Sequence, residues 1–293
     1  MIGAPKMEFD GRFIMQKKVD WSLLNHGFAI PVSVWNLFQV WDPSILIHGA
    51  SRDIKIIIGE KLFDAKLINQ NFDQNKFPGH KDLIQIRYNT GSSLAKELRR
   101  FFSKSYDYIY NRRAQNHNPR VPVSLPRDIN EFFRLFFTKD PNVFYLECNS
   151  DEEYKLLSGS LQRIGEDVYE SINDDAFFMQ DASASIEEKE RIVKCRKIDR
   201  NIINVLKKFY NYCDQISGEK IGSEYGESVV EAHHIDYFIN SLNNNSTNII
   251  IISPNYHRII HKNNPIFNRK KFQFEFLNGE ILKLKLFDHL KIS

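Results

Sequence analysis

The sequence predicts an α+β protein in which two folded parts are joined by an acidic, helical connector. Three observations support this fold class. Strand-like and helix-like segments mix before residue 150, an acidic stretch follows, and a strand–loop–strand–helix pattern occupies the C-terminal part. We therefore expect an N-terminal mixed α/β domain at 1–150, an acidic connector at 151–185 and a C-terminal domain at 186–293.

The size and composition suit a soluble protein of this kind. A chain of 293 residues is long enough for two modest domains, and 42% hydrophobic with 26% charged residues is ordinary for a globular protein. No apolar run reaches the roughly 18–20 residues that span a bilayer, and no secretory leader is visible. The three cysteines, Cys148, Cys195 and Cys213, are too scattered for a disulfide framework, which favours the cytoplasm.

Charge is unevenly distributed along the chain. Residues 96–127 carry eight basic and two acidic side chains, residues 147–190 carry thirteen acidic and three basic ones, and residues 191–293 carry sixteen basic and ten acidic ones. Two basic blocks separated by an acidic one suit two modules that each face nucleic acid and are joined by a solvated connector. Solvated helix faces would explain the same pattern about equally well.

The N-terminal elements follow from local patterns. Two strands are expected around a tight Gly-Glu-Lys turn at residue 59, and further strands near residues 83–88 and 143–147. Between them, apolar residues recur at helical spacing from Leu94 to Phe102, with Arg99 and Arg100 pointing elsewhere.

A long helix is expected to open the C-terminal domain. Ser185 and Glu188 have the spacing of a capping box, and the helix should run to about Tyr210. Its expected apolar stripe consists of Ile192, Ile198, Ile202, Val205, Leu206 and Phe209.

Four histidines follow at informative positions. The β-rich segment 229–238 places His233 and His234 on or at the end of a strand, where neighbouring side chains face opposite ways. After a polar loop, Asn248 begins a second strand. Pro254 then suits the first turn of a helix that carries His257 and His261 one turn apart on one face. This order of elements should bring His233, His257 and His261 to one point.

The residue types in this pattern suit hydrolysis of a phosphodiester bond. Three neutral imidazoles bind borderline divalent metals well. A metal with open positions polarises a phosphate oxygen and stabilises charge on the leaving oxygen. His234, beside the metal ligands, can take a proton from the attacking water near neutral pH, and Asn248 can hydrogen-bond across the hairpin to fix the backbone that carries His234.

Over residues 210–262 the chain resembles the HNH, or ββα-metal, endonucleases in their all-histidine variant. The resemblance implies that His233, His257 and His261 bind one divalent ion (Mg, Mn, Ni or Zn), that His234 is the general base and that Asn248 orients it. Glu231 also matches a family position, usually with a structural role. Arg258, between the helical ligands, is placed to touch a phosphate.

The chain departs from many HNH proteins in one respect. Those proteins hold a structural zinc with two Cys-x-x-Cys pairs. Here the first pair would be Cys213 and Ile216 and the second Ser253 and Tyr256, so three of the four thiolates are missing. We expect no structural zinc, and we expect Cys213 to belong to the core.

The N-terminal domain resembles, in its order of elements, the DNA-reading pseudobarrels of some restriction endonucleases and plant transcription factors. Trp21, Trp35 and Trp41 suit either core packing, which we favour, or a pocket for a flipped base. Candidate contacts to phosphates or base edges are Arg87, Arg99, Arg100, Arg112 and Arg113, although surface ion pairs explain any one of them as well.

The sequence thus favours a restriction-type, metal-dependent endonuclease that binds double-stranded DNA, acts as a homodimer and, if unmodified DNA is its target, has a cognate methyltransferase. The enzymatic alternatives are a nuclease specific for modified DNA and a homing-type nickase. The non-enzymatic alternative is a DNA-binding protein whose histidines hold a structural metal.

Overall fold

The computed structural model describes residues 12–70, 72, 83–115, 121–164 and 186–291. The chain divides into two compact units, residues 1–155 and 156–293, which are called the N-terminal and C-terminal units below. Both mix helices with strands, which confirms the α+β class. Residues 165–185 of the expected connector, and with them the Ser185 cap, lie outside the described residues.

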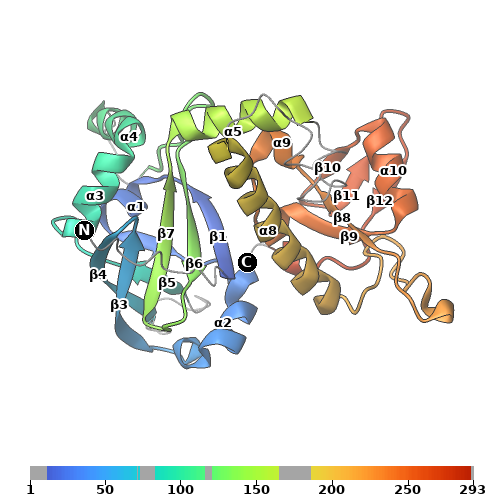
Figure 1. Ribbon diagram of the computed structural model, residues 1–293, viewed down its shortest axis with the longest axis horizontal. Helices are drawn as coiled ribbons and strands as arrows, with labels where there is room; N and C mark the ends of the chain where they lie inside the picture. Colours follow the sequence, from blue (N-terminus) through green and yellow to red (C-terminus); the bar gives the residue numbers. More distant parts are fainter. Residues whose placement is uncertain (1–11, 71, 73–82, 116–120, 165–185, 292–293) are drawn as a thin grey trace. The chain divides into compact units, whose positions relative to one another are not determined.

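The N-terminal unit contains a curled seven-stranded sheet (Figure 1). The strand order is β1-β6-β7-β3-β4-β5-β2, and all neighbouring strands are antiparallel except β3 and β7. The strands are β1 (Arg12–Lys18), β2 (Gly27–Ala29), β3 (Ser51–Ile58), β4 (Lys61–Asn69), β5 (Ile84–Arg87), β6 (Phe132–Phe137) and β7 (Val143–Asn149).

The β3–β4 hairpin was expected, with one difference at its turn. Lys61 already pairs with Ile58, so the connection is the two residues Gly59 and Glu60. Gly59 has a φ of +59°, a backbone conformation that glycine adopts without steric cost.

The described helices of this unit are α1 (Trp21–Asn25), α2 (Trp35–Trp41), α3 (Ser93–Phe101), α4 (Ser103–Gln115) and α5 (Asp151–Ile164), which continues past residue 155. Ser92 caps α3 by accepting a hydrogen bond from the Ala95 amide. A capping box begins α5, because the Ser150 amide donates to Glu153 and the Glu153 amide donates back to the Ser150 hydroxyl. The start of the acidic connector is therefore helical.

The C-terminal unit is organised around a two-stranded ribbon, β8 (Glu231–His234) and β9 (Ile249–Ile252). Its helices are α8 (Ile186–Phe209), α9 (Phe238–Ser241) and α10 (Pro254–Asn263). A three-stranded antiparallel sheet follows, with β10 (Ile266–Asn268), β11 (Gln273–Glu275) and β12 (Ile281–Lys283) in the order β10-β11-β12.

The ribbon is buried on both faces. All four isoleucines of β9 are fully buried, and Ile250 and Ile252 belong to one core cluster with Ile260 of α10 and Phe274 of β11. Side chains alternate along a strand, so Ile249 and Ile251 face the other way. The continuous apolar run of β9 thus reflects burial on two sides.

The apolar stripe of α8 was predicted correctly at four positions and wrongly at two. Ile192, Ile198, Ile202 and Leu206 are buried. Val205 is 41% exposed and Phe209 51% exposed, and Cys195 is buried instead. Successive residues of a helix are rotated by about 100°, which carries Val205 off the face that Leu206 occupies.

Among the helices that the structure describes, none combines the length and the apolar character that a membrane span requires.

Candidate active site

Three histidines from two elements of the C-terminal unit come together. His233 lies on β8, and His257 and His261 lie one turn apart on α10. One potential donor atom of each side chain lies within 4.8 Å of the other two. The Nε2 atoms of His257 and His261 are 3.0 Å apart. The structure therefore brings the three expected metal ligands to one point.

The chemistry of this donor set fits a single divalent ion. Metal–imidazole bonds are about 2 Å long, so two donors on one ion lie at most about 4 Å apart, which is close to the 4.8 Å within which these three atoms lie. Imidazole nitrogens suit Zn, Ni and related ions. The cluster is not deeply enclosed on all sides, since His233 is buried while His257 and His261 are half-buried.

Glu231 supports the cluster from the same face of β8 as His233. Its Oε2 lies 2.7 Å from Nδ1 of His257. A carboxylate on one imidazole nitrogen holds the proton there and leaves the lone pair of the other nitrogen for a metal. Burial lowers the pKa of Lys207 on α8, and the charge of Glu231 opposes that shift.

Tyr237 packs against the same cluster. Its ring stacks on His261 at a centroid distance of 5.1 Å and meets His233 edge-on. These contacts restrict the rotation of two of the three expected ligands. No sequence pattern indicated this role of Tyr237.

His234 occupies the opposite side of the ribbon. It pairs with Ile249 in the register, whereas His233 pairs with Ile250, so the two histidines project to opposite faces as predicted. The His234 ring lies near Phe238, and its Nε2 is 3.6 Å from a carboxylate oxygen of Asp199 on α8. His234 is only 2% exposed.

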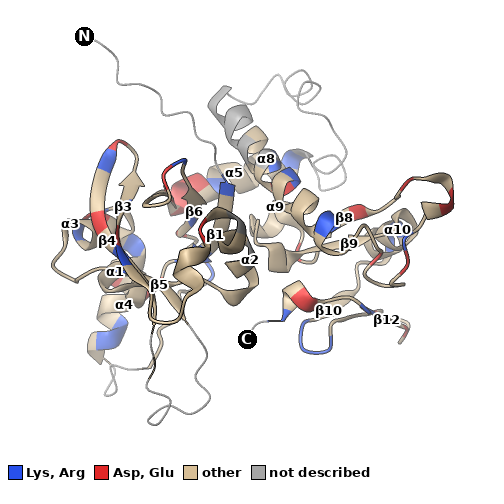
Figure 2. Cartoon of the chain, turned by 90° about the horizontal axis from the view of Figure 1, so that it is seen from below, with Lys and Arg blue, Asp and Glu red and all other residues tan. Residues whose placement is uncertain are grey.

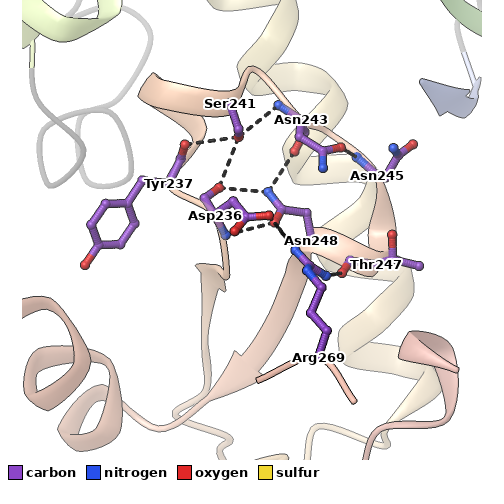
Figure 3. A network of polar contacts seen from close by, with 8 residues as sticks. All are labelled: Asp236, Tyr237, Ser241, Asn243, Asn245, Thr247, Asn248 and Arg269. Atoms are coloured by element: carbon purple, nitrogen blue, oxygen red, sulfur yellow. Dashed lines mark hydrogen bonds and ion pairs between the residues drawn. The ribbon is translucent and has the colours of Figure 1, made fainter. Parts of the chain in front are cut away.

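Asn248 fastens the loop after β8 to the start of β9 (Figure 3). Its Oδ1 accepts from the Asp236 amide and its Nδ2 donates to the carbonyl of Asp236, both at 2.9 Å. The Ile235 amide also donates to the Asn248 carbonyl. Asn248 is fully buried and makes the cross-hairpin hydrogen bonds expected of it, two residues beyond His234.

The same network reaches the three-stranded sheet (Figure 3). Arg269, between β10 and β11, donates to the carbonyl of Thr247 and to Oδ1 of Asn248 and forms an ion pair with Asp236. Asn248 Nδ2 also donates to the carbonyl of Asn243. These bonds tie the Asn248 loop to a second element.

A buried carboxylate joins the two segments, near residues 213–216 and 253–256, that were compared with cysteine pairs in the sequence. Asp214 is fully buried, and its carboxylate accepts from the amides of Ile216 and Ser217 on one side and of Ser253 on the other. It thereby joins the two segments in which the cysteine pairs would fall. The expectation that Cys213 belongs to the core was wrong, because this residue is only half-buried. The neighbouring Asp214 is the residue whose side chain is buried.

The neighbouring Gln215 strengthens the same junction. Its side chain accepts from the Ile251 amide and donates to the carbonyl of Leu286, and its backbone pairs with Ile251. Buried hydrogen bonds of Asp214 and Gln215 therefore hold this junction together.

The arginines expected to contact DNA differ in their surroundings. Arg258 on α10 is exposed, as are Arg87, Arg100 and Arg112 of the N-terminal unit. Arg100 forms an ion pair with Glu97, which lowers the pKa of that carboxyl to about 2. Arg112 lies over the ring of Tyr108.

Two other candidate arginines, Arg99 and Arg113, and the three tryptophans contact residues of their own unit. Arg99 donates to the Leu24 and Thr90 carbonyls and to Oδ1 of Asn25, so it braces its own unit. Arg113 lies over the ring of Trp21. The three tryptophans are partly buried against the core, as favoured from the sequence.

The sequence interpretation missed Asp199, Asn244 and Asp214. Asp199 interrupts the apolar face of α8 directly after Ile198, and a charged residue at such a position was a usable signal. Asn244 and Asp214 lie in irregular segments where no periodicity separates buried polar residues from exposed ones.

No protein-family model, curated protein or solved structure matches this chain.

Proposed function

We propose that the chain is a metal-dependent DNA endonuclease of restriction type, an endodeoxyribonuclease of HNH architecture. The observation that carries this proposal is the convergence of His233, His257 and His261 from β8 and α10. Three converging imidazoles suit a divalent metal ion, and His234, the next residue of β8, is the residue that we assign as general base.

The reaction assigned to the site is hydrolysis of a phosphodiester. His234 takes a proton from water, the water oxygen forms a bond to phosphorus, and the bond from phosphorus to the 3′ oxygen breaks. The products are a 5′-phosphate and a 3′-hydroxyl, the latter protonated from solvent. A bound divalent ion supplies polarisation of a phosphate oxygen and stabilises charge on the leaving oxygen.

The N-terminal unit is assigned the search for the DNA site. A nuclease module that contacts mainly phosphates carries little sequence information, so a second domain is needed for selectivity. The curled sheet is compatible with a DNA-reading pseudobarrel, and the exposed Arg87 and Arg112 are its candidate DNA contacts.

A plasmid-cleavage assay on the full-length chain tests the proposal. We expect cutting with at least one of Mg, Mn, Ni or Zn ions and none with EDTA. His234→Ala should reduce the cleavage rate at least about 100-fold while DNA binding and metal binding persist, because general-base catalysis contributes roughly 10²–10⁴-fold. His26→Ala, which removes an exposed histidine of the N-terminal unit, is the matched control. Full activity in His234→Ala would overturn the assignment of the base.

A structural metal site is the second candidate, because His233 and His234 are 1% and 2% exposed. In that case EDTA would unfold the C-terminal unit, and no metal would support cutting.

The target and assembly need separate measurements. Cleavage of methylated against unmethylated plasmid, with mapped ends, separates a restriction enzyme from a nuclease that requires modified DNA. Because one site cuts one strand, double-strand cleavage predicts a homodimer, whereas a monomer that only nicks supports the homing-type alternative. Light scattering during cleavage distinguishes these two.

A further inference from the structure

We propose that Lys270 and Lys271, in the turn between β10 and β11, bind the phosphate backbone of duplex DNA beside the histidine cluster. This inference rests on the proposed nuclease function and deepens it, because it identifies a surface of the C-terminal unit that holds the substrate. Three observations support it: the charge of the turn, the contacts that hold its backbone, and its attachment to the loop that follows β8.

Positive charge is concentrated at one end of the three-stranded sheet. Arg269, Lys270 and Lys271 follow one another between β10 and β11 and form the basic loop next to β10 in Figure 2. Lys283 of β12 pairs in register with Gln273, so it lies at the same end of the sheet. The turn at the other end, between β11 and β12, contains no lysine or arginine and one glutamate.

The two lysines of the turn are available to an external anion. Both are exposed, and within the described ranges neither side chain forms a hydrogen bond or an ion pair. The preceding Arg269 differs, because it forms an ion pair with Asp236. The three consecutive cations therefore divide into one that anchors the turn and two that face solvent.

One carboxylate opposes the charge of the lysines. The side chains of Gln273 and Asn268 donate hydrogen bonds to Glu275 and lower its pKa, and the charge of Lys271 adds to this shift. Glu275 is therefore ionised at neutral pH. Lys270, Lys271 and Lys283 outnumber it by three to one, which leaves a net positive charge at this end of the sheet for a polyanion such as DNA.

Several contacts hold the backbone of the turn. Oδ1 of Asn268 accepts from the amides of Lys270 and Lys271, both at 3.2 Å. Phe272 has a φ of +52°, a left-handed conformation that is costly for a residue other than glycine and persists where the surroundings enforce it. Its ring stacks on Phe287 at a centroid distance of 4.5 Å. A turn held in this way loses little conformational freedom when it binds a partner.

The hairpin is attached to the histidine cluster at two points. Arg269 contacts Thr247 and Asp236, and Asp236 is three residues from His233, a span of at most about 11 Å. Phe274 of β11 meets the ring of His233 at a centroid distance of 6.1 Å. One strand of duplex DNA carries a phosphate about every 3.4 Å along the axis. Phosphates that neighbour one bound at the cluster are therefore within reach of the turn.

The salt dependence of DNA binding gives the first test, and it needs neither metal nor cleavage. The metal-free, full-length chain is titrated with a fluorescent duplex of mixed sequence at about 50 to 200 mM salt. Each phosphate contact contributes about 0.9 to the slope of log K against log salt. Lys270→Gln with Lys271→Gln should therefore reduce the slope by about 1.8 and weaken binding by up to about 60-fold at 0.1 M salt.

Two matched variants separate a local contact from the overall charge. Lys208→Gln with Lys220→Gln removes two exposed lysines of the same unit and should leave the slope at the wild-type value. Lys270→Arg with Lys271→Arg keeps both charges and should retain the wild-type slope, and thermal unfolding verifies that every variant is folded. The proposal is overturned if the turn variant keeps the wild-type slope, or if the control variant reduces the slope equally.

Cleavage kinetics give the second test. The lysines contact the backbone in the ground state and in the transition state alike. The double Gln variant of the turn should therefore raise KM roughly 10-fold or more and leave kcat within about twofold of the wild type. A fall in kcat at unchanged KM would contradict a role in holding the substrate.

The two proposals fail in distinguishable ways. If the wild-type chain cuts DNA but the turn variant keeps the wild-type salt slope and KM, the role of the lysines is wrong and the nuclease proposal stands. If the turn variant reduces the salt slope but no metal supports cutting by the wild type, the DNA contact stands and the nuclease proposal fails.

Discussion

His233 and His234 are adjacent in the chain, but their side chains have different surroundings. His233 faces α10 and the other two histidines, whereas His234 faces α8 and Asp199. Strand geometry alone predicts that neighbours diverge. What each histidine meets on its face depends on elements that are far away in the sequence.

Glu231 should matter for metal affinity more than its exposure suggests. Its carboxylate holds Nδ1 of His257. We expect Glu231→Gln to weaken metal binding roughly 10- to 100-fold, measured by competition with a chromophoric chelator. Glu224→Gln, a nearby exposed change, is the control. Equal affinities in the wild type and in Glu231→Gln would show that His257 needs no such partner.

His289 should make the C-terminal unit sensitive to acid. Its Nε2 donates to the Ile249 carbonyl and its Nδ1 accepts from Tyr210. Burial lowers the pKa of His289 below its usual 6.5, and hydrogen bonds to backbone carbonyls and the Asp288 charge oppose the shift. Because the folded pKa is depressed, the unfolded chain takes up the proton first as the pH falls.

The His289 contribution to stability is therefore present above about pH 6.5 and declines as the pH falls through the lowered folded pKa. Urea unfolding at pH 7.5 and pH 5 measures it. We expect His289→Gln to have a lower free energy of unfolding than the wild type at pH 7.5. The difference in free energy between the two proteins should be smaller at pH 5, by at most about 1.4 kcal/mol per pH unit. A gap that is constant or widens toward acid would contradict the assignment.

At the level of elements, two buried polar residues join the segments around residues 213–217 and 253. Asp214 receives three backbone amides from these two segments, and Gln215 pins them to β9. No sequence pattern indicated which residues join these segments, because buried and exposed aspartates look alike in a loop sequence.

Asp214→Ala should strongly destabilise the C-terminal unit. The change leaves three amides, of Ile216, Ser217 and Ser253, without their acceptor, and we expect a loss of about 3 kcal/mol or more in the free energy of unfolding. Urea denaturation provides the measurement. Asp288→Ala, which removes an exposed carboxylate, should change it by less than about 0.5 kcal/mol. Comparable losses in the two variants would argue against the bridging role.

At the level of the whole molecule, the expected metal ligands all belong to one of the two compact units. Binding to the folded state stabilises only what folds with the site, so metal should protect the C-terminal unit selectively. An ion at 100 times its dissociation constant adds about 2.7 kcal/mol.

Hydrogen exchange with and without Ni or Zn ions measures this selectivity. We expect slower exchange in β8, β9 and α10, little change in β3 and β4, and no effect of metal in His257→Ala. Equal protection of both units would mean that they unfold as one, and protection that persists in His257→Ala would place the metal elsewhere.

Local sequence patterns were sufficient to predict several elements of the C-terminal unit and one hairpin of the N-terminal unit. Four features depend on the hydrophobic period and the turn residues within a short segment. They are the strand–loop–strand–helix order, the start of α10 at Pro254, the one-turn spacing of His257 and His261, and the β3–β4 hairpin. The burial of polar residues and the identity of their partners became visible in the folded chain alone. Asp199 meets His234 across 35 positions and Asp214 meets Ser253 across 39, and such pairings follow from how elements pack rather than from any nearby pattern.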